Sequence, residues 1–245
     1  MPMIIFSLII QVALIVHCVR SGRAQMWIWI ILFVPLVGSI AYVAVELLPD
    51  LMHGRTARTA ARKLRRTLDP GRDLREKAAL VRQSGNVSSR SEYARELLRS
   101  GDAKQAIVVL RETLTGIYEN DPDLMLQLAE AEHTAGDAAA ARSTLENLIR
   151  NNPEFKSPDG HLLYARALED SGDTGKAVEE YAVLASYYPG AEARVRYARL
   201  LKSTGNDIEA RKVLRELMDH AALAPAHYRR AQREWLAQAK QELSG

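Results

Sequence analysis

The sequence contains very little cysteine and few aromatic residues, and both shortages exclude kinds of function. Cys18 is the one cysteine among 245 residues, which excludes an internal disulfide framework and a cysteine-based metal cluster. Aromatic residues make up 6% of the chain. A large aromatic-lined cofactor pocket is therefore not expected, and we predict neither a cofactor nor a metal site.

Charge is scarce at the N-terminus. Residues 1–50 contain only four charged side chains: Arg20, Arg23, Glu46 and Asp50. Residues 1–19 and 26–45 contain none. An α-helix rises about 1.5 Å per residue, so about twenty apolar residues span a bilayer core of about 30 Å. The two apolar runs, joined by a short turn, predict a transmembrane helical hairpin over residues 1–50.

Basic residues near the ends of the two predicted helices bear on topology. The turn has two arginines, whereas residues 55–66 contain six Lys and Arg. Because the larger basic excess stays in the cytoplasm, we expect a multi-pass protein of the bacterial inner (cytoplasmic) membrane whose remaining chain faces the cytoplasm. The turn arginines favour the opposite orientation, so the topology stays open.

The basic charge is concentrated in one stretch. Residues 51–82 contain ten Lys and Arg against three Asp and Glu, whereas residues 83–245 contain 21 against 25. The C-terminal part is mildly acidic, so we expect no nucleic-acid partner. Residues 55–68 have helical spacing, and their basic face either contacts anionic lipid headgroups or serves only as a topology signal. The candidate headgroup contacts are Arg58, Arg62, Lys63, Arg65 and Arg66.

One feature of the predicted hairpin is similar to a known anchor. Trp27 and Trp29 begin the second apolar run, which continues with the sequence PLVGSIAY at residues 35–42. These residues resemble the membrane hairpin that precedes the catalytic domains of phospholipase D-type cardiolipin synthases. The H-x-K-x4-D motif of that family is missing from the chain, so the resemblance implies a similar anchor without the chemistry.

No sequence motif indicates catalysis. The six histidines are dispersed, with no HExxH pair. Residues 172–177 (GDTGKA) lack the glycine spacing of a phosphate loop and the Ser or Thr after Lys. There is no G-x-S-x-G nucleophile elbow. We therefore predict that the protein is not an enzyme.

The rest of the chain contains an internal repeat. Four segments align on an apolar-Ala pair, a Gly-Asp or Gly-Asn pair seven residues further on, and an alanine after four more. The pairs lie 35, 36 and 33 residues apart: Tyr93-Ala94, Leu128-Ala129, Tyr164-Ala165 and Tyr197-Ala198. Each unit then adds a large apolar residue: Leu110, Leu145, Tyr181 and Leu214.

Each repeated position has a physical role in a pair of antiparallel helices. Alanines let two helices approach closely, and the large apolar residue fills the space beside them. The glycine tolerates left-handed dihedral angles at the turn. The Asp or Asn after it favours the N-terminus of the next helix. The pattern predicts four helix-turn-helix units.

A helix pair that repeats near every 34 residues is typical of tetratricopeptide repeats, and residues 87–220 resemble that family. The resemblance implies an all-α fold in which an α-solenoid of about four helix pairs (87–222) follows the hairpin (1–50) and a basic juxtamembrane linker (51–86). A C-terminal capping helix (223–245) would close the array. Glu132 departs from the family pattern because it takes an apolar position, which predicts looser packing there.

The resemblance also implies a concave groove lined by the first helix of each unit. Carrying the family's groove positions over predicts an apolar strip flanked by charged and polar side chains. The predicted groove residues are Arg95, Leu126, Glu130, His133, Leu162, Arg166, Val195, Arg199 and Lys202. The alternative is that these charges only solvate helix faces.

From this architecture we predict a membrane-anchored scaffold or adaptor that binds a protein partner in its groove. Its setting would be the assembly or regulation of an envelope complex. The alternative is an anionic-lipid-associated regulator of a membrane lipid enzyme.

Overall fold

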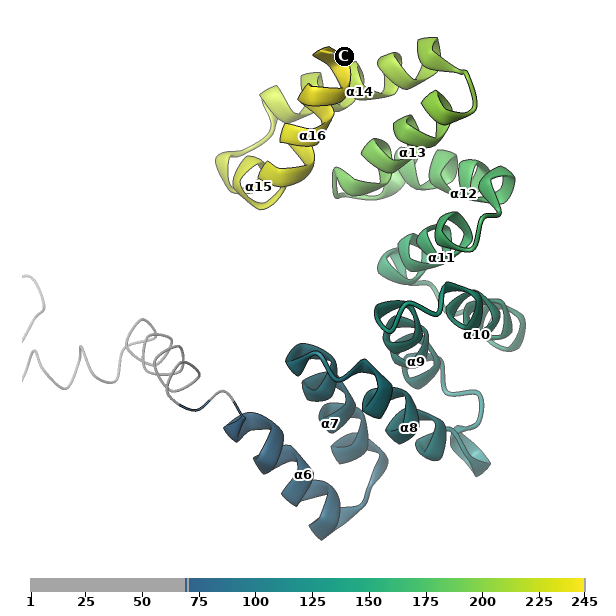
Figure 1. Ribbon diagram of the computed structural model, residues 1–245, viewed down its shortest axis with the longest axis vertical. Coiled ribbons are helices and arrows are strands. Elements are labelled where there is room, and N and C mark those ends of the chain that lie inside the picture. The colour runs from purple at the N-terminus through teal and green to yellow at the C-terminus, as the bar shows by residue number, and fades with distance from the viewer. Residues whose placement is uncertain (1–68, 70, 245) are drawn as a thin grey trace, which may run out of the picture. The chain divides into compact units, whose positions relative to one another are not determined.

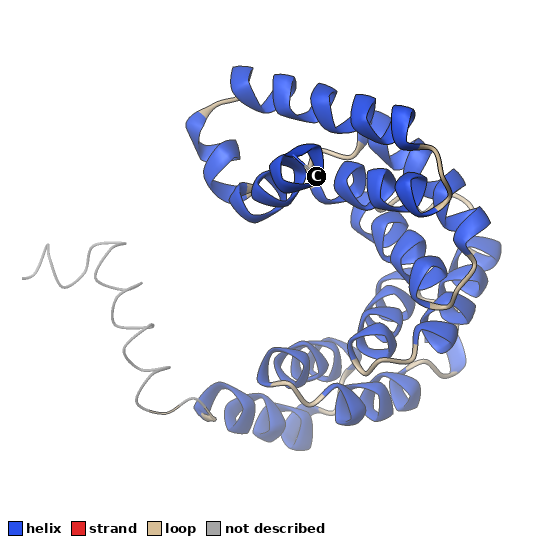
Figure 2. Ribbon diagram, turned by 45° about the horizontal axis from the view of Figure 1, so that its top comes forward, coloured by secondary structure: helices blue, strands red, loops and turns tan. Residues whose placement is uncertain are grey.

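The computed structural model describes residues 69 and 71–244, and every regular element in that part of the chain is a helix (Figure 2). The predicted hairpin, the helix over residues 55–68 with its lipid-contacting side chains, and the resemblance to cardiolipin synthases lie outside the described residues. Within them, none of the helices combines the length and the apolar character that crossing a bilayer requires.

Residues 73–245 form one compact unit of stacked helix pairs. Successive helices lie side by side in chain order (Figure 1). The four pairs are α7 (Val87–Ser100) with α8 (Ala103–Thr113), α9 (Pro122–Thr134) with α10 (Ala138–Asn151), α11 (Pro158–Asp170) with α12 (Thr174–Tyr187), and α13 (Glu192–Ser203) with α14 (Asp207–Leu223). Helix α6 (Arg72–Ser84) precedes them, and α15 (Ala226–Ala231) and α16 (Arg233–Ser244) follow. A short 3-10 helix, η2 (Gly116–Tyr118), joins the first two units.

The predicted turn chemistry is confirmed within each pair. Gly101 has a φ of 89°, in the left-handed region that glycine tolerates. The side chain of Asp102 then accepts a hydrogen bond from the backbone N–H of Gln105 and caps α8. The corresponding glycines of the other three units also have positive φ angles, so the four units end and restart their helices by one mechanism.

The repeated apolar positions form the core. The repeated alanines of the second helices are at most 3% exposed: Ala106, Ala141, Ala177 and Ala210. The large residues beside them are also buried: Leu110, Leu145, Tyr181 and Leu214. Alanine at the closest approach of two helices leaves no gap, and one large side chain per unit supplies most of the buried apolar area.

The first helices of the units lie on one side of the array, which we call the inner face; the second helices form the outer face. Helix α9 contacts both α7 and α11, its counterparts in the neighbouring units. Each second helix instead packs mainly against the first helices on either side of it. This arrangement places the predicted groove positions on α7, α9, α11 and α13.

Glu132 is buried with both carboxylate oxygens hydrogen-bonded, so the predicted loose packing is not found there. Its side chain is 2% exposed, accepts from Arg111 Nη2 at 2.8 Å, and accepts from Thr144 Oγ1 at 2.7 Å. A buried carboxylate is tolerated when it is paired and hydrogen-bonded. Glu132 therefore joins α8, α9 and α10 through polar contacts at a position that is usually apolar.

Replacing Glu132 by leucine is expected to leave the free energy of unfolding unchanged or to raise it by about 1 kcal/mol. Glu132 is the buried partner of this pair, and the Arg111 side chain, which is 60% exposed, can be hydrated instead, so the substitution leaves no buried charge without a partner. Glu132→Ala, which leaves a cavity as well, should cost about 2 kcal/mol. Urea unfolding of both variants measures the difference, and a loss of more than about 2 kcal/mol in Glu132→Leu would show that the polar network is required.

The C-terminal segment differs from the single helix that was predicted. It forms two helices, α15 and α16, separated at Gln232. The side chain of Gln232 accepts a hydrogen bond from the backbone N–H of Ala191 at 2.9 Å, just before α13. Helix α16 packs on α14 and α13, as the first helix of a fifth unit would, and so covers the end of the array.

Candidate functional site

The predicted groove residues lie on one face but differ in exposure. Four charged members are exposed: Arg95, Glu130, Arg199 and Lys202. Three are partly buried: Leu126, His133 and Arg166. Arg95, Glu130, Arg166 and Arg199 occupy equivalent positions in the four units, so the inner face presents one long charged or polar side chain per unit.

The predicted apolar strip is not a continuous surface. Leu162 is 6% exposed and Val195 is 0% exposed, and both belong to the hydrophobic core. Leu162 packs with Tyr181 and Leu184, which belong to the second helix of its own unit. Leu162 and Val195 therefore stabilise the stacking of the units. Leu126, the third member of the predicted strip, is the one that keeps a partly exposed surface.

Polar side-chain contacts join neighbouring first helices along the inner face. His133 Nε2 lies 2.8 Å from Asp170 Oδ2, which links α9 to α11. Arg196 Nη1 lies 3.0 Å from Glu169 Oε2, which links α11 to α13. These pairs hold adjacent units in register, so part of the inner-face charge is structural.

The C-terminal helix also uses inner-face charges. Glu242 of α16 accepts a hydrogen bond from Arg199 Nε at 3.0 Å, and Lys202 Nζ lies 3.5 Å from the same carboxylate. In contrast, no ion pair is found for Arg95 or Glu130 within residues 71–244. The charges that remain available to a partner therefore lie mainly on the first two units.

The outer face contains a cavity that was not predicted from the sequence. It has a volume of about 410 Å³ and lies between α10, α11 and α12. Its apolar wall comes from α10, from the loop that follows, and from α11: Leu145, Leu148, Ile149, Phe155 and Tyr164. The cavity forms only when two neighbouring units stack. The sequence signal that could have indicated this cavity is Ile149, an apolar residue at a position where the repeat pattern does not require one.

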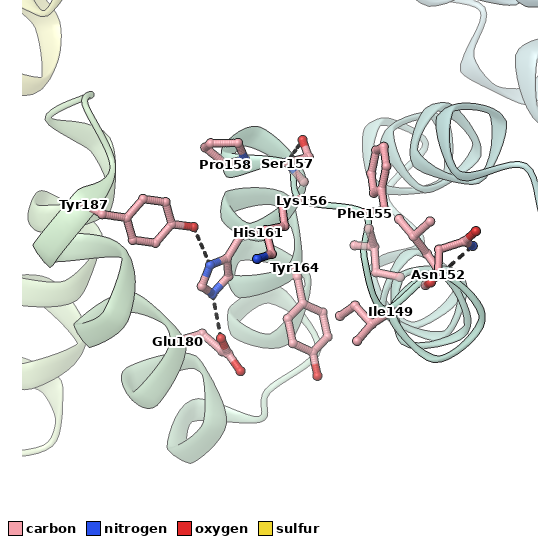
Figure 3. Close-up of a pocket in the computed structure, with 13 residues that line it drawn as sticks. Ile149, Asn152, Phe155, Lys156, Ser157, Pro158, His161, Tyr164, Glu180 and Tyr187 are labelled. Atoms are coloured by element: carbon pink, nitrogen blue, oxygen red, sulfur yellow. Dashed lines mark hydrogen bonds and ion pairs between the residues drawn. The ribbon is translucent and has the colours of Figure 1, made fainter.

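The polar wall of this cavity is centred on His161 (Figure 3). Its Nδ1 atom lies 2.6 Å from the hydroxyl of Tyr187, and its Nε2 atom lies 2.6 Å from Glu180 Oε2. The rings of His161 and Tyr187 are stacked with their centroids 5.9 Å apart. Both ring nitrogens are thus engaged, and the imidazole is fixed as part of the wall.

Tyr188 is the residue at which α12 ends, and its environment predicts a pH dependence. Its hydroxyl donates a hydrogen bond to Asp159 Oδ1 at 3.0 Å. Burial, and then this hydrogen bond, raises the pKa of Tyr188 to about 12, whereas an unfolded tyrosine has a pKa near 10. A raised phenol pKa stabilises the folded state below about pH 10, and this contribution is lost as the pH rises from about 10 to about 12.

We therefore expect the melting temperature to fall less steeply between about pH 10 and about pH 12 in Tyr188→Phe than in the unmodified chain. Differential scanning calorimetry across this range provides the measurement. Lysines and Tyr181, whose pKa is also raised by burial, titrate in both proteins and cancel in the comparison. Parallel curves for the two proteins would contradict the raised pKa.

The described residues offer little for metal chemistry. No group of three or more His, Cys, Asp or Glu side chains within residues 71–244 is arranged to hold a metal ion. The fold itself is of a kind that typically serves as a scaffold. The features that remain are an inner face with exposed charges and an outer cavity that is mainly apolar.

Comparison with known proteins agrees with this architecture. The tetratricopeptide-repeat family matches residues 97–167. No curated protein sequence is similar enough to match. A structure of MamA from Desulfovibrio magneticus RS-1 is similar at a TM-score of 0.56 and 15% identity, over 70% of this chain and 99% of that one. A thermophilic TPR protein from Thermus thermophilus is similar at a TM-score of 0.52 and 18% identity, over 70% and 89%. The family match over residues 97–167 and the fold of these neighbours support an array of tetratricopeptide-type helix pairs.

Proposed function

We propose that this protein is a membrane-anchored scaffold that binds a protein partner on its inner face. The observation that carries the proposal is the stack of four helix pairs whose first helices present one long polar side chain per unit at equivalent positions. Such an array gives an extended surface on rigid elements. The polar side chains of this surface are suited to binding a segment of a partner protein more than to catalysis.

The charges that remain available suggest how the segment is held. Arg95 is exposed on α7, and Glu130 is exposed on α9. Arg166 on α11 is partly buried: its Nε atom is buried 3.7 Å from Glu192 Oε1, and its two terminal nitrogens make no hydrogen bond within residues 71–244. Guanidinium groups donate to peptide carbonyls and carboxylates in a fixed geometry. A partner segment running along the inner face would meet an arginine, a glutamate and an arginine in turn.

Site-specific photo-crosslinking tests this proposal. A photoreactive amino acid replaces Glu130 in the full chain, expressed in its own host, and adducts are read by mass shift. We expect one discrete adduct that is lost when Arg95→Glu and Arg166→Glu are added. The matched control carries the photoreactive amino acid in place of Lys104, at an exposed position on α8. An adduct from both positions, or one that survives the charge reversals, would contradict the inner-face site.

The proposed anchor rests on the two uncharged runs of residues 1–19 and 26–45. Anchoring would confine the repeats to the membrane plane and raise the effective concentration of partners located there. A scaffold held at the membrane in this way would suit the assembly or regulation of a bacterial envelope complex. Protease added to intact spheroplasts tests the proposed cytoplasmic side: a C-terminal tag should survive until lysis, and immediate digestion would place the repeats in the periplasm.

The alternative role, regulation of a membrane lipid enzyme, rests on the basic residues of the segment 55–68. If those charges bind anionic headgroups, each contributes about 1 kcal/mol near the surface. Changing Arg62, Lys63, Arg65 and Arg66 to alanine should then reduce flotation with phosphatidylglycerol vesicles. If flotation depends on these charges while the adduct at Glu130 is never seen, the lipid role replaces the scaffold role.

A further inference from the structure

The outer-face cavity between the second and third units has the properties of a specific binding site. It lies on the side of the array opposite to the proposed inner-face site, so it is separate from it. Its volume of about 410 Å³ falls within the range of about 300–1,000 Å³ that is common for ligand pockets. The wall is mainly apolar, with polar groups at defined positions.

The rim of the cavity keeps apolar surface in contact with solvent. Ile149 is 55% exposed and Tyr187 is 46% exposed, and they face the cavity from α10 and α12. Val183, one helical turn before Tyr187, is 53% exposed. Large apolar side chains that surround a depression are the usual form of an interface hot spot, where an anchor side chain of a partner is buried.

The charge at the mouth indicates the chemistry of the occupant. Lys156 lines the cavity beside His161 (Figure 3) and has no acidic partner among residues 71–244. It lies two residues before α11, whose first turn contains Asp159, and that carboxylate accepts a hydrogen bond from the Tyr188 hydroxyl. Glu180, an acidic group of the wall, is engaged by His161. An apolar occupant that carries negative charge next to its anchor would therefore be favoured.

The aromatic residues of the wall indicate which type of partner side chain the cavity would hold. Phe155 and Tyr164 belong to the wall, and their rings can pack edge to face against an aromatic side chain. The fixed His161 ring beside Tyr187 adds a third flat surface. We propose that this cavity binds a protein segment in which an aromatic side chain is flanked by acidic residues.

Fluorescence polarisation with defined peptides tests the proposal on the full chain. The probe is fluorescein-labelled Gly-Asp-Phe-Asp-Gly, compared with Gly-Asn-Phe-Asn-Gly and Gly-Asp-Ala-Asp-Gly. We expect the first peptide to bind at least about fivefold more tightly than either of the others. Equal binding of the Asp and Asn peptides, or of the Phe and Ala peptides, would overturn the proposed occupant.

Paired variants assign the binding to the cavity. Ile149→Ala should weaken binding about tenfold because it removes apolar contact area, and Lys156→Glu should weaken it about fivefold. Both positions are exposed, so folding is retained. The matched controls on α8, Val108→Ala and Lys104→Glu, and the inner-face variant Arg95→Glu, at an exposed position, should leave the affinity unchanged. Equal loss in the controls would overturn the site.

The same variants test whether a second copy of this chain is the occupant. Sedimentation velocity of the full chain should give the same oligomeric state for Ile149→Ala and the unmodified protein. If Ile149→Ala instead dissociates an oligomer, the cavity is an interface between copies and the peptide proposal is wrong. Because the peptides report on the cavity and the adduct at Glu130 reports on the inner face, failure here and failure of the scaffold function are distinguishable.

Discussion

Replacing Tyr181 by alanine is expected to lower the free energy of unfolding of the repeat array by about 3–5 kcal/mol. Tyr181 is the largest fully buried side chain among the described residues and is 0% exposed. It lies in a cluster that includes Leu162, Leu168 and Leu184. The other buried members of the cluster are leucines and alanines, whose short side chains would fill only part of the space that the ring leaves.

The hydroxyl and the ring of Tyr181 contribute separately. The hydroxyl donates a hydrogen bond to Glu169 Oε2 at 2.7 Å, and Arg196 binds the same oxygen. Tyr181→Phe keeps the ring and leaves Glu169 paired with Arg196, so it should cost only about 1 kcal/mol. Urea unfolding of both variants gives the two contributions. A similar loss in both would mean that the hydrogen bond, and not ring packing, stabilises this unit.

The fold could be predicted from the sequence because its determinants are local. Gly-Asp pairs end one helix and cap the next within a few residues, and the alanine that follows marks the closest helix approach. Those contacts lie between residues close in sequence, so the repeat spacing was enough to predict four helix pairs. The repeat pattern likewise predicts Tyr181 as the large residue of the third unit, and it is fully buried.

The site was less predictable because exposure depends on how neighbouring units are rotated against each other. Leu126, Leu162 and Val195 are equivalent in the repeat, yet only Leu126 is partly exposed. Likewise, the outer cavity is built by side chains from three helices and one loop. The motif spacing does not encode such an arrangement, and His161 could not be placed beside Tyr187 and Glu180 from the sequence.

Replacing Trp235 by alanine is expected to destabilise the last unit by about 2–3 kcal/mol while leaving the first unit unchanged. Trp235 of α16 packs against the hydrophobic cluster that contains Val195, Leu214 and Leu217. Its ring also lies under the guanidinium of Arg196, 5.5 Å from the ring centroid. The side chain is partly buried, so the loss should be smaller than the value of about 3–5 kcal/mol for a fully buried tryptophan.

Hydrogen exchange tests whether this effect stays local. Each unit of a solenoid contacts only its neighbours, so loss of the α16 packing should open α13 and α14 first. Amides of these two helices should lose protection by about a factor of 30 or more, which corresponds to about 2 kcal/mol. Amides of α7 and α8 should be unaffected, and Trp235→Phe should keep most of the protection. Uniform loss along the array would instead mean that the four units unfold as one cooperative body, and that α16 stabilises the whole array and not only its end.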